Sequence, residues 1–483
     1  MSTTSNVSAG KRIEALLDDN SFVEIGSLVT ARNTDFNLTE KETPADGVIT
    51  GYGLINNNPV YVYSQDAAVL GGSVGEMHAK KIVRLYDMAM KMGAPVIGLV
   101  DSAGLRLEEA TDALNAFGEI YAKQVMASGV IPQISAVFGN CGGGLSVMTG
   151  LTDFTFMADD GHLFVNSPNT IDGNTIDKCD SSGVGFQSAE AGNVDFSGDE
   201  ATVIEKIREL VSMIPANNEE NMSYEECTDD LNRGCESIDT LSGDTALALA
   251  SISDNHVFFE LKKEYAKEMV TGFIRLNGTT VGAVANRTER YDEEMNKVEE
   301  FAAALTAKGC EKAAAFVEFC DAFEIPVLTL TNAKGFRTSM CQEKKMVKAA
   351  AKLTYAFANA TVPKVNVIVK EAFGTAYSIM NSKALGADLV FAWPDTKVGM
   401  MSGDSAARII YADEITKADS ANAFIGEKAA EYEALQLSVN SAAGRGYIDS
   451  IIEPVDTRKY VIGAYEMLFT KREDRPAKKH GTV

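Results

Sequence analysis

The chain has 483 residues, of which 45% are hydrophobic and 23% are charged. This length and composition predict a soluble globular protein with two domains, or with one domain that has been duplicated. The net charge of −24 argues against a nucleic-acid partner, which would require a basic surface.

The residue types also restrict the compartment and the chemistry. The seven cysteines contain no Cys-x-x-Cys pair, no apolar run is long enough to span a bilayer, and the N-terminus has no apolar signal segment. These features predict a cytoplasmic protein. The four histidines show no metal-ligand spacing, so no metal site is expected.

In chain order, the first half alternates strands with helices. Short apolar strands are predicted at "NPVYVYSQD" (58–66) and "PVIGLV" (95–100), separated by the helix "EMHAKKIVRLYD" (76–87). A further buried strand begins at Ile131 and ends in "GNCGGGLSVMTG" (139–150). Strands that alternate with helices in this way predict parallel βαβ units.

The second half repeats this order. Two pairs of segments correspond, 91–104 with 322–335 and 129–146 with 360–377. Pro95 and Pro326 are 231 positions apart, and so are Pro132 and Pro363. A constant offset over more than a hundred residues predicts an internal duplication.

The predicted domain boundary lies between the two repeats. Residues 213–244 are acidic, rich in Asn and Glu, and without clear periodicity. We therefore expect a first domain at 1–215, an acidic linker at 216–243 and a second domain at 244–483.

Three consecutive glycines, Gly142 to Gly144, close a strand in the first half. They indicate either a crowded turn or a backbone oxyanion hole at the start of a helix. No Gly-Lys-Ser/Thr pattern follows the glycines, which excludes a P-loop, and Ser146 after them has no evident His partner, which argues against a Ser–His triad. The repeat aligns Gly143 and Gly144 with Gly374 and Thr375, so both halves have a glycine at a predicted helix start.

Several longer segments carry a resemblance to a known family. The chain resembles the carboxyltransferase subunits of biotin-dependent acyl-CoA carboxylases and of sodium-pumping acyl-CoA decarboxylases, of the propionyl-CoA carboxylase β and methylmalonyl-CoA decarboxylase α types. The resemblance rests on "ADGVITGYG" (45–53), "GGSVGEMHAKKI" (71–82), "ASGVIPQIS" (127–135), "FCDAFEIP" (319–326), "ATVPKVNVI" (360–368), "FAWPD" (391–395) and "RGYIDSIIEP" (445–454).

The resemblance implies an α/β fold with two tandem crotonase-like domains. It implies transfer of a carboxyl group between biotin, held on a separate carrier protein, and the α-carbon of an acyl-CoA. It also implies a homo-oligomer, a hexamer with sites shared between chains, and a biotin carboxylase or membrane decarboxylase subunit as a further partner.

The site residues follow from the same resemblance. Backbone oxyanion holes are expected at Gly143 with Gly144, and at Gly374, Thr375 and Ala376. Acyl-CoA is expected near Gly71, Gly72 and Ser73, with Lys80, Lys81 and Arg106 as candidates for its phosphates. The biotin pocket is expected at Tyr377, Ser378 and Ser402.

The chain departs from the family pattern at several of its glycines. Ala103, Thr375 and Ser402 stand where the family has glycine, and the changes are concentrated in the second half. Two alternatives to carboxyl transfer therefore stay open: a biotin-independent crotonase-type decarboxylase, hydratase or isomerase, and a non-catalytic scaffold subunit. The sequence leaves the acyl group and the reaction direction open.

Overall fold

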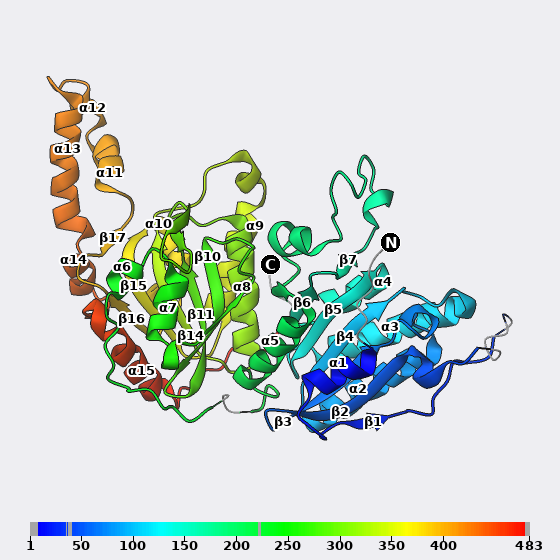
Figure 1. Ribbon diagram of the computed structural model, residues 1–483. Coiled ribbons are helices and arrows are strands. Elements are labelled where there is room, and N and C mark those ends of the chain that lie inside the picture. The colour runs from blue at the N-terminus through cyan, green and yellow to red at the C-terminus, as the bar shows by residue number, and fades with distance from the viewer. Residues whose placement is uncertain (1–7, 35, 37–40, 221–223, 479–483) are drawn as a thin grey trace. The chain divides into compact units, whose positions relative to one another are not determined.

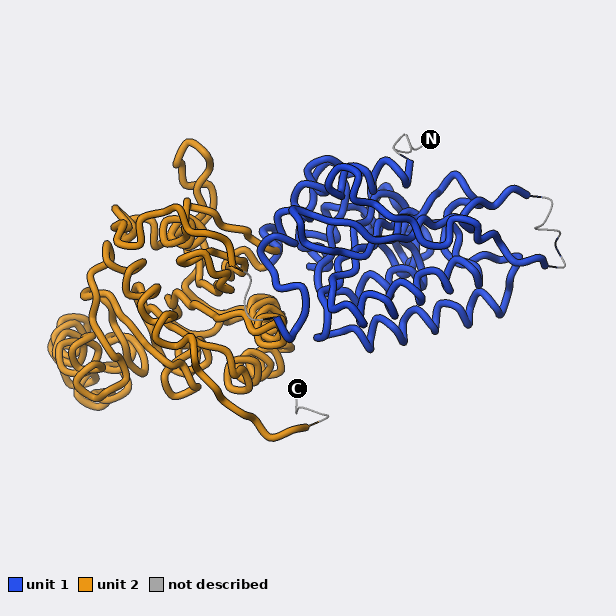
Figure 2. Tube along the Cα trace, turned by 90° about the horizontal axis from the view of Figure 1, so that it is seen from below, with its two compact units in different colours: residues 1–223, 262–265 blue, residues 224–261, 266–483 orange. Residues whose placement is uncertain are grey.

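The computed structural model describes residues 8–34, 36, 41–220 and 224–478 (Figure 1). The chain forms two compact units (Figure 2). Unit 1 comprises residues 1–223 with 262–265, and unit 2 comprises 224–261 with 266–483. Each unit has its own sheet and its own buried apolar core.

Unit 1 is a mixed sheet covered by helices. Its strands have the order β1-β2-β3-β4-β5-β6-β8, and β7 also pairs with β5. The strands are β1 (Val23–Ile25), β2 (Val48–Ile55), β3 (Asn58–Gln65), β4 (Val96–Ser102), β5 (Gln133–Gly142), β6 (Phe154–Ala158), β7 (His162–Phe164) and β8 (Phe196–Gly198). The helices are α1 (Ala9–Leu16), α2 (Glu76–Met92), α3 (Ala110–Ala127), α4 (Gly144–Gly150) and α5 (Glu200–Met213).

Unit 2 has the same strand order, β9-β10-β11-β14-β15-β16-β18, with β17 paired to β15. The strands are β9 (Phe258–Leu261), β10 (Met269–Leu276), β11 (Thr279–Asn286), β14 (Val327–Ala333), β15 (Lys364–Phe373), β16 (Leu389–Ala392), β17 (Lys397–Gly399) and β18 (Ser450–Ile451), with a separate pair β12 (Glu289–Tyr291) and β13 (Lys297–Glu300). The helices are α6 (Ile238–Leu241), α7 (Thr245–Ile252), α8 (Ala307–Ala322), α9 (Met340–Asn359), α10 (Gly374–Ile379), α11 (Gly403–Ile410), α12 (Ala412–Ile415), α13 (Ala421–Tyr432), α14 (Val439–Gly444) and α15 (Thr457–Leu468).

The strand register confirms the duplication. Val96 of β4 pairs with Gln133 of β5, and 231 positions later Val327 of β14 pairs with Lys364 of β15. Both ladders shift register near their carboxyl ends, at 100–102 and at 331–333. The carbonyls of Pro95 and Pro326 accept equivalent bonds from β3 and β11, so the two prolines occupy equivalent strand starts.

The central strands of each sheet are parallel, as the βαβ pattern predicts, whereas the strands at one edge are antiparallel. β4, β5 and β6 are parallel, but β2 and β3 form an antiparallel hairpin, as do β10 and β11. The hairpin turns are Asn56–Asn57 and Asn277–Gly278, and all four residues have positive φ. Asn and Gly tolerate this conformation, which matches the twist of the flanking strands. The Asn277–Gly278 pair is itself a sequence signal for such a hairpin.

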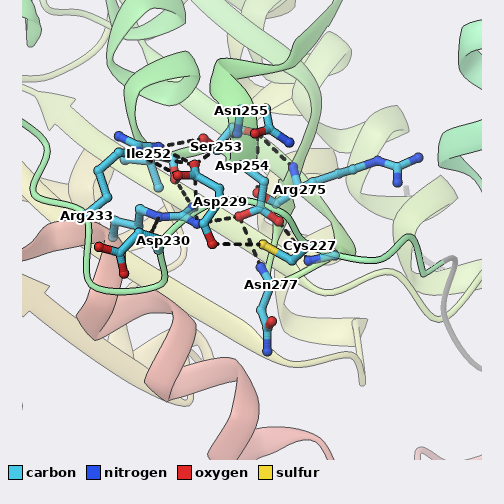
Figure 3. Close-up of polar contacts among 12 residues, drawn as sticks. Cys227, Asp229, Asp230, Arg233, Ile252, Ser253, Asp254, Asn255, Arg275 and Asn277 are labelled. Carbon is cyan, nitrogen blue, oxygen red and sulfur yellow. Dashed lines mark hydrogen bonds and ion pairs between the residues drawn. The ribbon is translucent and has the colours of Figure 1, made fainter.

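Most of the expected linker at 216–243 is part of unit 2. Residues from 224 onward belong to that unit, and Cys235 and Ile238 are buried in its core. Asp229 forms an ion pair with Arg233 at 3.0 Å and accepts a bond from the N–H of Asn255 (Figure 3). At least one acidic residue of this segment is therefore part of the folded unit, as the half-buried partner of an arginine.

Candidate active site

The first Gly-rich turn joins β5 to α4. Gly143 has φ +61° and ψ −126°, a conformation that L side chains rarely adopt. A Cβ added at Gly143 would meet no atom within 4 Å, so backbone conformation rather than crowding requires glycine there. The N–H of Gly143 donates to the carbonyl of Phe164 on β7 at 2.9 Å. This bond ties the turn to the sheet.

The first backbone N–H groups of α4, which follows this turn, have no hydrogen-bond acceptor within the helix. Gly144 and Leu145 are the first residues of α4, and the first N–H groups of a helix have no intrahelical acceptor. The donors at this turn are therefore the N–H groups after Gly143 rather than its own. Of the two residues expected at this hole, Gly143 has its N–H engaged by Phe164, whereas Gly144 stands at the helix start.

Tyr121 holds the same turn from α3. Its hydroxyl donates to the carbonyl of Gly144 at 2.7 Å. A Cβ at Gly144 would lie only 2.8 Å from that hydroxyl, so glycine is required here by close approach. Burial raises the pKa of Tyr121, which keeps the hydroxyl a donor at neutral pH. Tyr121 was not predicted from the sequence, because its place 23 positions before the glycine carries no motif.

A second loop converges on the carboxyl ends of β4 and β5. Gly71 and Gly72 both have φ +66°, and the carbonyl of Gly71 accepts a 2.8 Å bond from the N–H of Ala103. A Cβ at Gly72 would lie 2.4 Å from the Asp101 carbonyl, and one at Gly104 would lie 4.0 Å from the Gly142 carbonyl. Ligands in sheets of this kind bind outside the carboxyl ends of parallel strands. Gly104 therefore lies with Gly71 and Gly72 at the carboxyl ends of β4 and β5, although it was not among the predicted site residues.

The second Gly-rich turn has the same backbone form in unit 2. Gly374 opens α10 with φ +61°, and a Cβ there would lie 3.1 Å from the Met400 carbonyl. Thr375 is the second residue of α10, is exposed, and is not among the residues with positive φ. Threonine in place of glycine thus leaves the helix start unstrained. Ala376 is buried behind it.

The residues expected around biotin serve different local roles. Ser378 is exposed, and its hydroxyl donates to the Gly374 carbonyl at 3.3 Å. Tyr377 packs against the apolar cluster beside β16, and burial raises its pKa to about 12. Ser402 caps α11 by accepting a bond from the N–H of Ser405. Only Ser378 bonds directly to the turn.

Two of the three cations predicted for CoA phosphates are buried. Lys81 donates to the carbonyls of Ala45 and Val48, and burial lowers its pKa to about 8. Arg106 is 1% exposed. Its guanidinium is held by the carboxylates of Asp46 and Glu109. These contacts satisfy both cations inside the protein, so they are poorly placed to bind a phosphate.

Arg106 instead fixes the loop that carries the glycines, because its guanidinium donates to the carbonyl of Ser73 at 2.6 Å. Lys80 is the exposed member of the predicted set. It forms an ion pair at 2.5 Å with Glu76, which raises its pKa.

Two side chains near the turns that could act as nucleophile or base, Cys141 and His78, are both buried. Burial raises the pKa of Cys141 to about 12 and lowers that of His78 to about 3. His78 lies between Gln65 and the Asp46 carbonyl, which accounts for both ring nitrogens. Among the described residues, no group of three or more His, Cys, Asp or Glu could hold a metal ion. Backbone donors are therefore the chemistry that the two turns offer.

The comparison with known protein families covers almost the entire chain. Residues 5–483 match the carboxyl transferase domain. The chain belongs to this family. Members of the family that it resembles at full length include an acyl-CoA carboxylase subunit and a decarboxylase subunit, which makes it an enzyme of the acyl-CoA carboxyltransferase type.

Two relatives are similar to this chain over nearly its full length. The chain is 40% identical to the propionyl-CoA carboxylase beta chain of Roseobacter denitrificans, covering 99% of this chain and 93% of the relative. It is 38% identical to the methylmalonyl-CoA decarboxylase subunit alpha of Propionigenium modestum, with the same coverage.

A solved structure of the family has the same duplicated fold. The transcarboxylase 12S crystal structure, described as a hexamer with hydrolysed methylmalonyl-coenzyme A bound, matches with a TM-score of 0.92. It is 36% identical and the match covers 99% of this chain and 93% of that one. In the described part of this chain, no helix combines the length and apolar character needed to cross a bilayer.

Proposed function

We propose that this protein moves a carboxyl group between biotin, carried on a separate protein, and the α-carbon of an acyl-CoA thioester. The observation that carries the proposal is the pair of equivalent Gly-rich turns, one in each unit, in a chain of the carboxyl transferase family. The relatives include both carboxylases and decarboxylases, which share this transfer step.

The first turn is suited to the thioester oxygen. As the α-carbon loses a proton or a carboxyl group, negative charge develops on that oxygen. The N–H groups of Gly144 and Leu145 start α4 and are free of intrahelical acceptors. Tyr121 fixes the Gly144 peptide, and the Gly143–Phe164 bond fixes the turn. Donors held in place before the reaction stabilise this charge without a reorganisation cost.

The second turn is suited to a carbonyl oxygen of the carboxyl carrier. Biotin supplies the transferable carboxyl group and has a ureido oxygen that can accept hydrogen bonds. The chain offers the N–H groups of Gly374, Thr375 and Ala376 at the start of α10. The exposure of Thr375 and its lack of a positive φ support this fit.

The CoA portion is proposed to pass over the loop of Gly71, Gly72 and Ser73. This loop lies at the carboxyl edge of β4 and β5, beside the first turn. Lys80 is the cation that we retain for the phosphates, while Lys81 and Arg106 hold the protein's own backbone.

The proposed assembly is a homo-hexamer, as described for transcarboxylase 12S, with sites shared between chains. The proposed partners are a biotin carboxyl carrier protein and a biotin carboxylase or membrane decarboxylase subunit.

Carboxyl exchange tests the function directly. Purified protein is incubated with free biotin and 14C-carboxyl-labelled methylmalonyl-CoA or malonyl-CoA, and label transferred to biotin is measured. We expect transfer that stops when avidin is added. Decarboxylation that continues in avidin-treated solution would favour the biotin-independent alternative. Absence of acyl-CoA binding by calorimetry would favour a scaffold.

A further inference from the structure

The two proposed oxyanion holes are at the start of very short helices, α4 and α10, which we call the hole helices (Figure 1). α4 has seven residues and α10 has six, and helices of this length are not stable on their own. The direction of the N–H groups at the start of each helix therefore depends on the contacts that hold the rest of it. Contacts at the carboxyl end of each hole helix thus help to set where its donors point.

In unit 1, the side-chain amide of Gln124 on α3 holds the end of α4. Gln124 is 0% exposed, and its Nε2 donates a 2.9 Å hydrogen bond to the carbonyl of Met148 in the last turn of the helix. The backbone carbonyl of Gln124 accepts a 3.1 Å bond from the side chain of Gln133 on β5. The end of α4 is thus connected through one buried amide to α3 and, through Gln133, to β5.

In unit 2, Asn366 on β15 holds the end of α10. Asn366 is also 0% exposed, and its Nδ2 donates to the carbonyl of Met380, the residue that follows α10, at 3.3 Å. Its Oδ1 accepts a 2.8 Å bond from the hydroxyl of Thr331 on β14, which orients the amide. Asn381, the next residue along the chain, donates from its side chain to the hydroxyl of Thr329 at 3.1 Å. The end of α10 is therefore held on both β14 and β15.

The two amides are not copies produced by the duplication. With the offset of 231 that relates the repeats, the counterpart of Gln124 is Tyr355 and the counterpart of Asn366 is Ser135. A buried amide costs free energy unless its hydrogen bonds are made, so each is present for a reason that the duplication does not supply. Both units make the same contact from different positions, which points to a requirement at the end of the helix.

We propose that Gln124 and Asn366 are positioning residues of the two oxyanion holes. The inference rests on the proposed carboxyl transfer. Each side chain acts through its hole helix: by fixing the carboxyl end, it fixes the direction of the N–H groups at the start, where negative charge develops on the bound oxygen. Such an effect can be large, because misplacing a reacting group by about 1 Å can cost about a hundredfold in rate.

Asn366→Asp tests the contact in unit 2 with little change of shape. One oxygen can still accept from Thr331, and a protonated carboxyl group can donate to the Met380 carbonyl, whereas an ionised one cannot. Because burial raises the pKa of a carboxyl group, we compare kcat for carboxyl exchange with that of the parent protein from about pH 5 to about pH 9. We expect the ratio to fall about tenfold or more as pH rises, with the KM for acyl-CoA unchanged. A constant ratio would overturn the role of Asn366.

Gln124→Glu applies the same test to the Met148 carbonyl in unit 1. The ratio of its kcat to that of the parent should also fall about tenfold or more over this range, and a constant ratio would overturn the role of Gln124. Thr331→Val is a second variant for unit 2, because it removes the hydroxyl that orients Asn366 without adding a charge. It should lower kcat about threefold at every pH, and an unchanged kcat would count against the Asn366 contact even if Asn366→Asp does not fold.

Ser253→Ala controls for a loss of stability alone. Ser253 is buried, and its hydroxyl bonds to the backbone N–H and carbonyl of Arg275, at the hairpin end of β10 and away from the hole helix. This variant should unfold at a lower urea concentration and keep the kcat of the parent at every pH. If the Gln124 and Asn366 variants behave like this control while the parent is active, only the positioning role is wrong. A parent protein that exchanges no carboxyl group would overturn the proposed function itself, and this inference with it.

Discussion

The guanidinium of Arg458 on α15 donates a 2.6 Å hydrogen bond to the carboxylate of Asp254, and both residues are buried in unit 2. Asp254 also accepts bonds from the N–H groups of Asn277 and Gly278, the hairpin turn between β10 and β11 (Figure 3). Unit 1 repeats the arrangement: Arg208 on α5 contacts Asp18, which accepts from the N–H groups of Asn56 and Asn57. Each unit thus ties its hairpin to its last long helix with one Asp–Arg pair.

The two pairs differ in burial, so they should differ in their effect on stability. Arg458→Met leaves the buried Asp254 carboxylate without its main partner and should lower the free energy of unfolding by about 3–5 kcal/mol. Arg208→Met breaks a pair in which each side chain is 26% exposed, and should cost about 1 kcal/mol or less. Urea unfolding measures both. Equal costs would show that burial does not set the contribution of these pairs.

Gly143→Ala should impair the first turn through its backbone. The conformation at Gly143 requires glycine although space is available for a Cβ, and a strained residue costs about 1–3 kcal/mol. A distorted turn would misplace the α4 donors, so we expect carboxyl exchange to fall about a hundred- to thousandfold. Gly150→Ala, at the end of α4 and also with space around it, should keep full activity. An active Gly143→Ala protein with normal assembly would show that the first turn does not take part in the transfer.

Tyr121 and Gly144 should show coupled effects. Tyr121→Phe removes one hydrogen bond and should cost about 1 kcal/mol in stability while lowering kcat more than it changes KM. Gly144→Ala alone places a Cβ 2.8 Å from the Tyr121 hydroxyl and should be strongly impaired. In the Tyr121→Phe background the same alanine has more room, so its added cost should be smaller. Additive effects in this double-mutant cycle would contradict the contact.

Thr375 offers a test of a single backbone donor. Thr375→Pro removes only the N–H at the first turn of α10, where proline is tolerated, and should reduce carboxyl exchange about a hundredfold or more. Thr375→Gly retains the N–H and costs at most about 1 kcal/mol in helix stability, so exchange should stay within about threefold. Circular dichroism confirms that both variants fold. Normal exchange by a folded Thr375→Pro protein would place the second hole elsewhere.

Asp153 should make the stability of unit 1 depend on pH. Burial raises the pKa of Asp153 from 3.8, the ordinary aspartate value, to about 7. An acid with a raised folded-state pKa binds its proton more tightly when folded, so stability falls as pH rises from about 4 to about 7. Asp153→Asn should therefore be more stable than the parent protein at pH 8, with the difference shrinking or reversing toward pH 4.

Asp388 in unit 2 is the matched control for this titration. It accepts the N–H of Lys364 just as Asp153 accepts that of Gln133, but it also forms an ion pair with Lys471 at 2.9 Å. Asp388→Asn breaks that pair and should not stabilise the protein at pH 8. If the free energies of unfolding of Asp153→Asn and of the parent protein change with pH in the same way, Asp153 does not titrate in this range.

The sequence by itself determined the duplication, the central parallel strands and the two Gly-rich turns. Hydrophobic periodicity and the constant offset between the repeats, as between Pro95 and Pro326, are read directly from the order of the residues, and the fold shows the same strands and the same duplication. The glycines of both turns were visible in the sequence, but the structure shows that Gly143 and Gly374, and not Gly142 or Gly144, have the positive φ that glycine adopts at little cost.

Only the tertiary structure decided what the charged and polar groups near the turns do. Lys81 and Arg106 look like phosphate ligands on a helix or loop, but they are buried because carbonyls and carboxylates from distant segments converge on them. Tyr121 acquires its role, and the acidic segment around Asp229 becomes ordered, for the same reason. Whether a polar group faces solvent or a partner depends on which strands and helices meet, and that is set by packing across the whole unit rather than by neighbours in the chain.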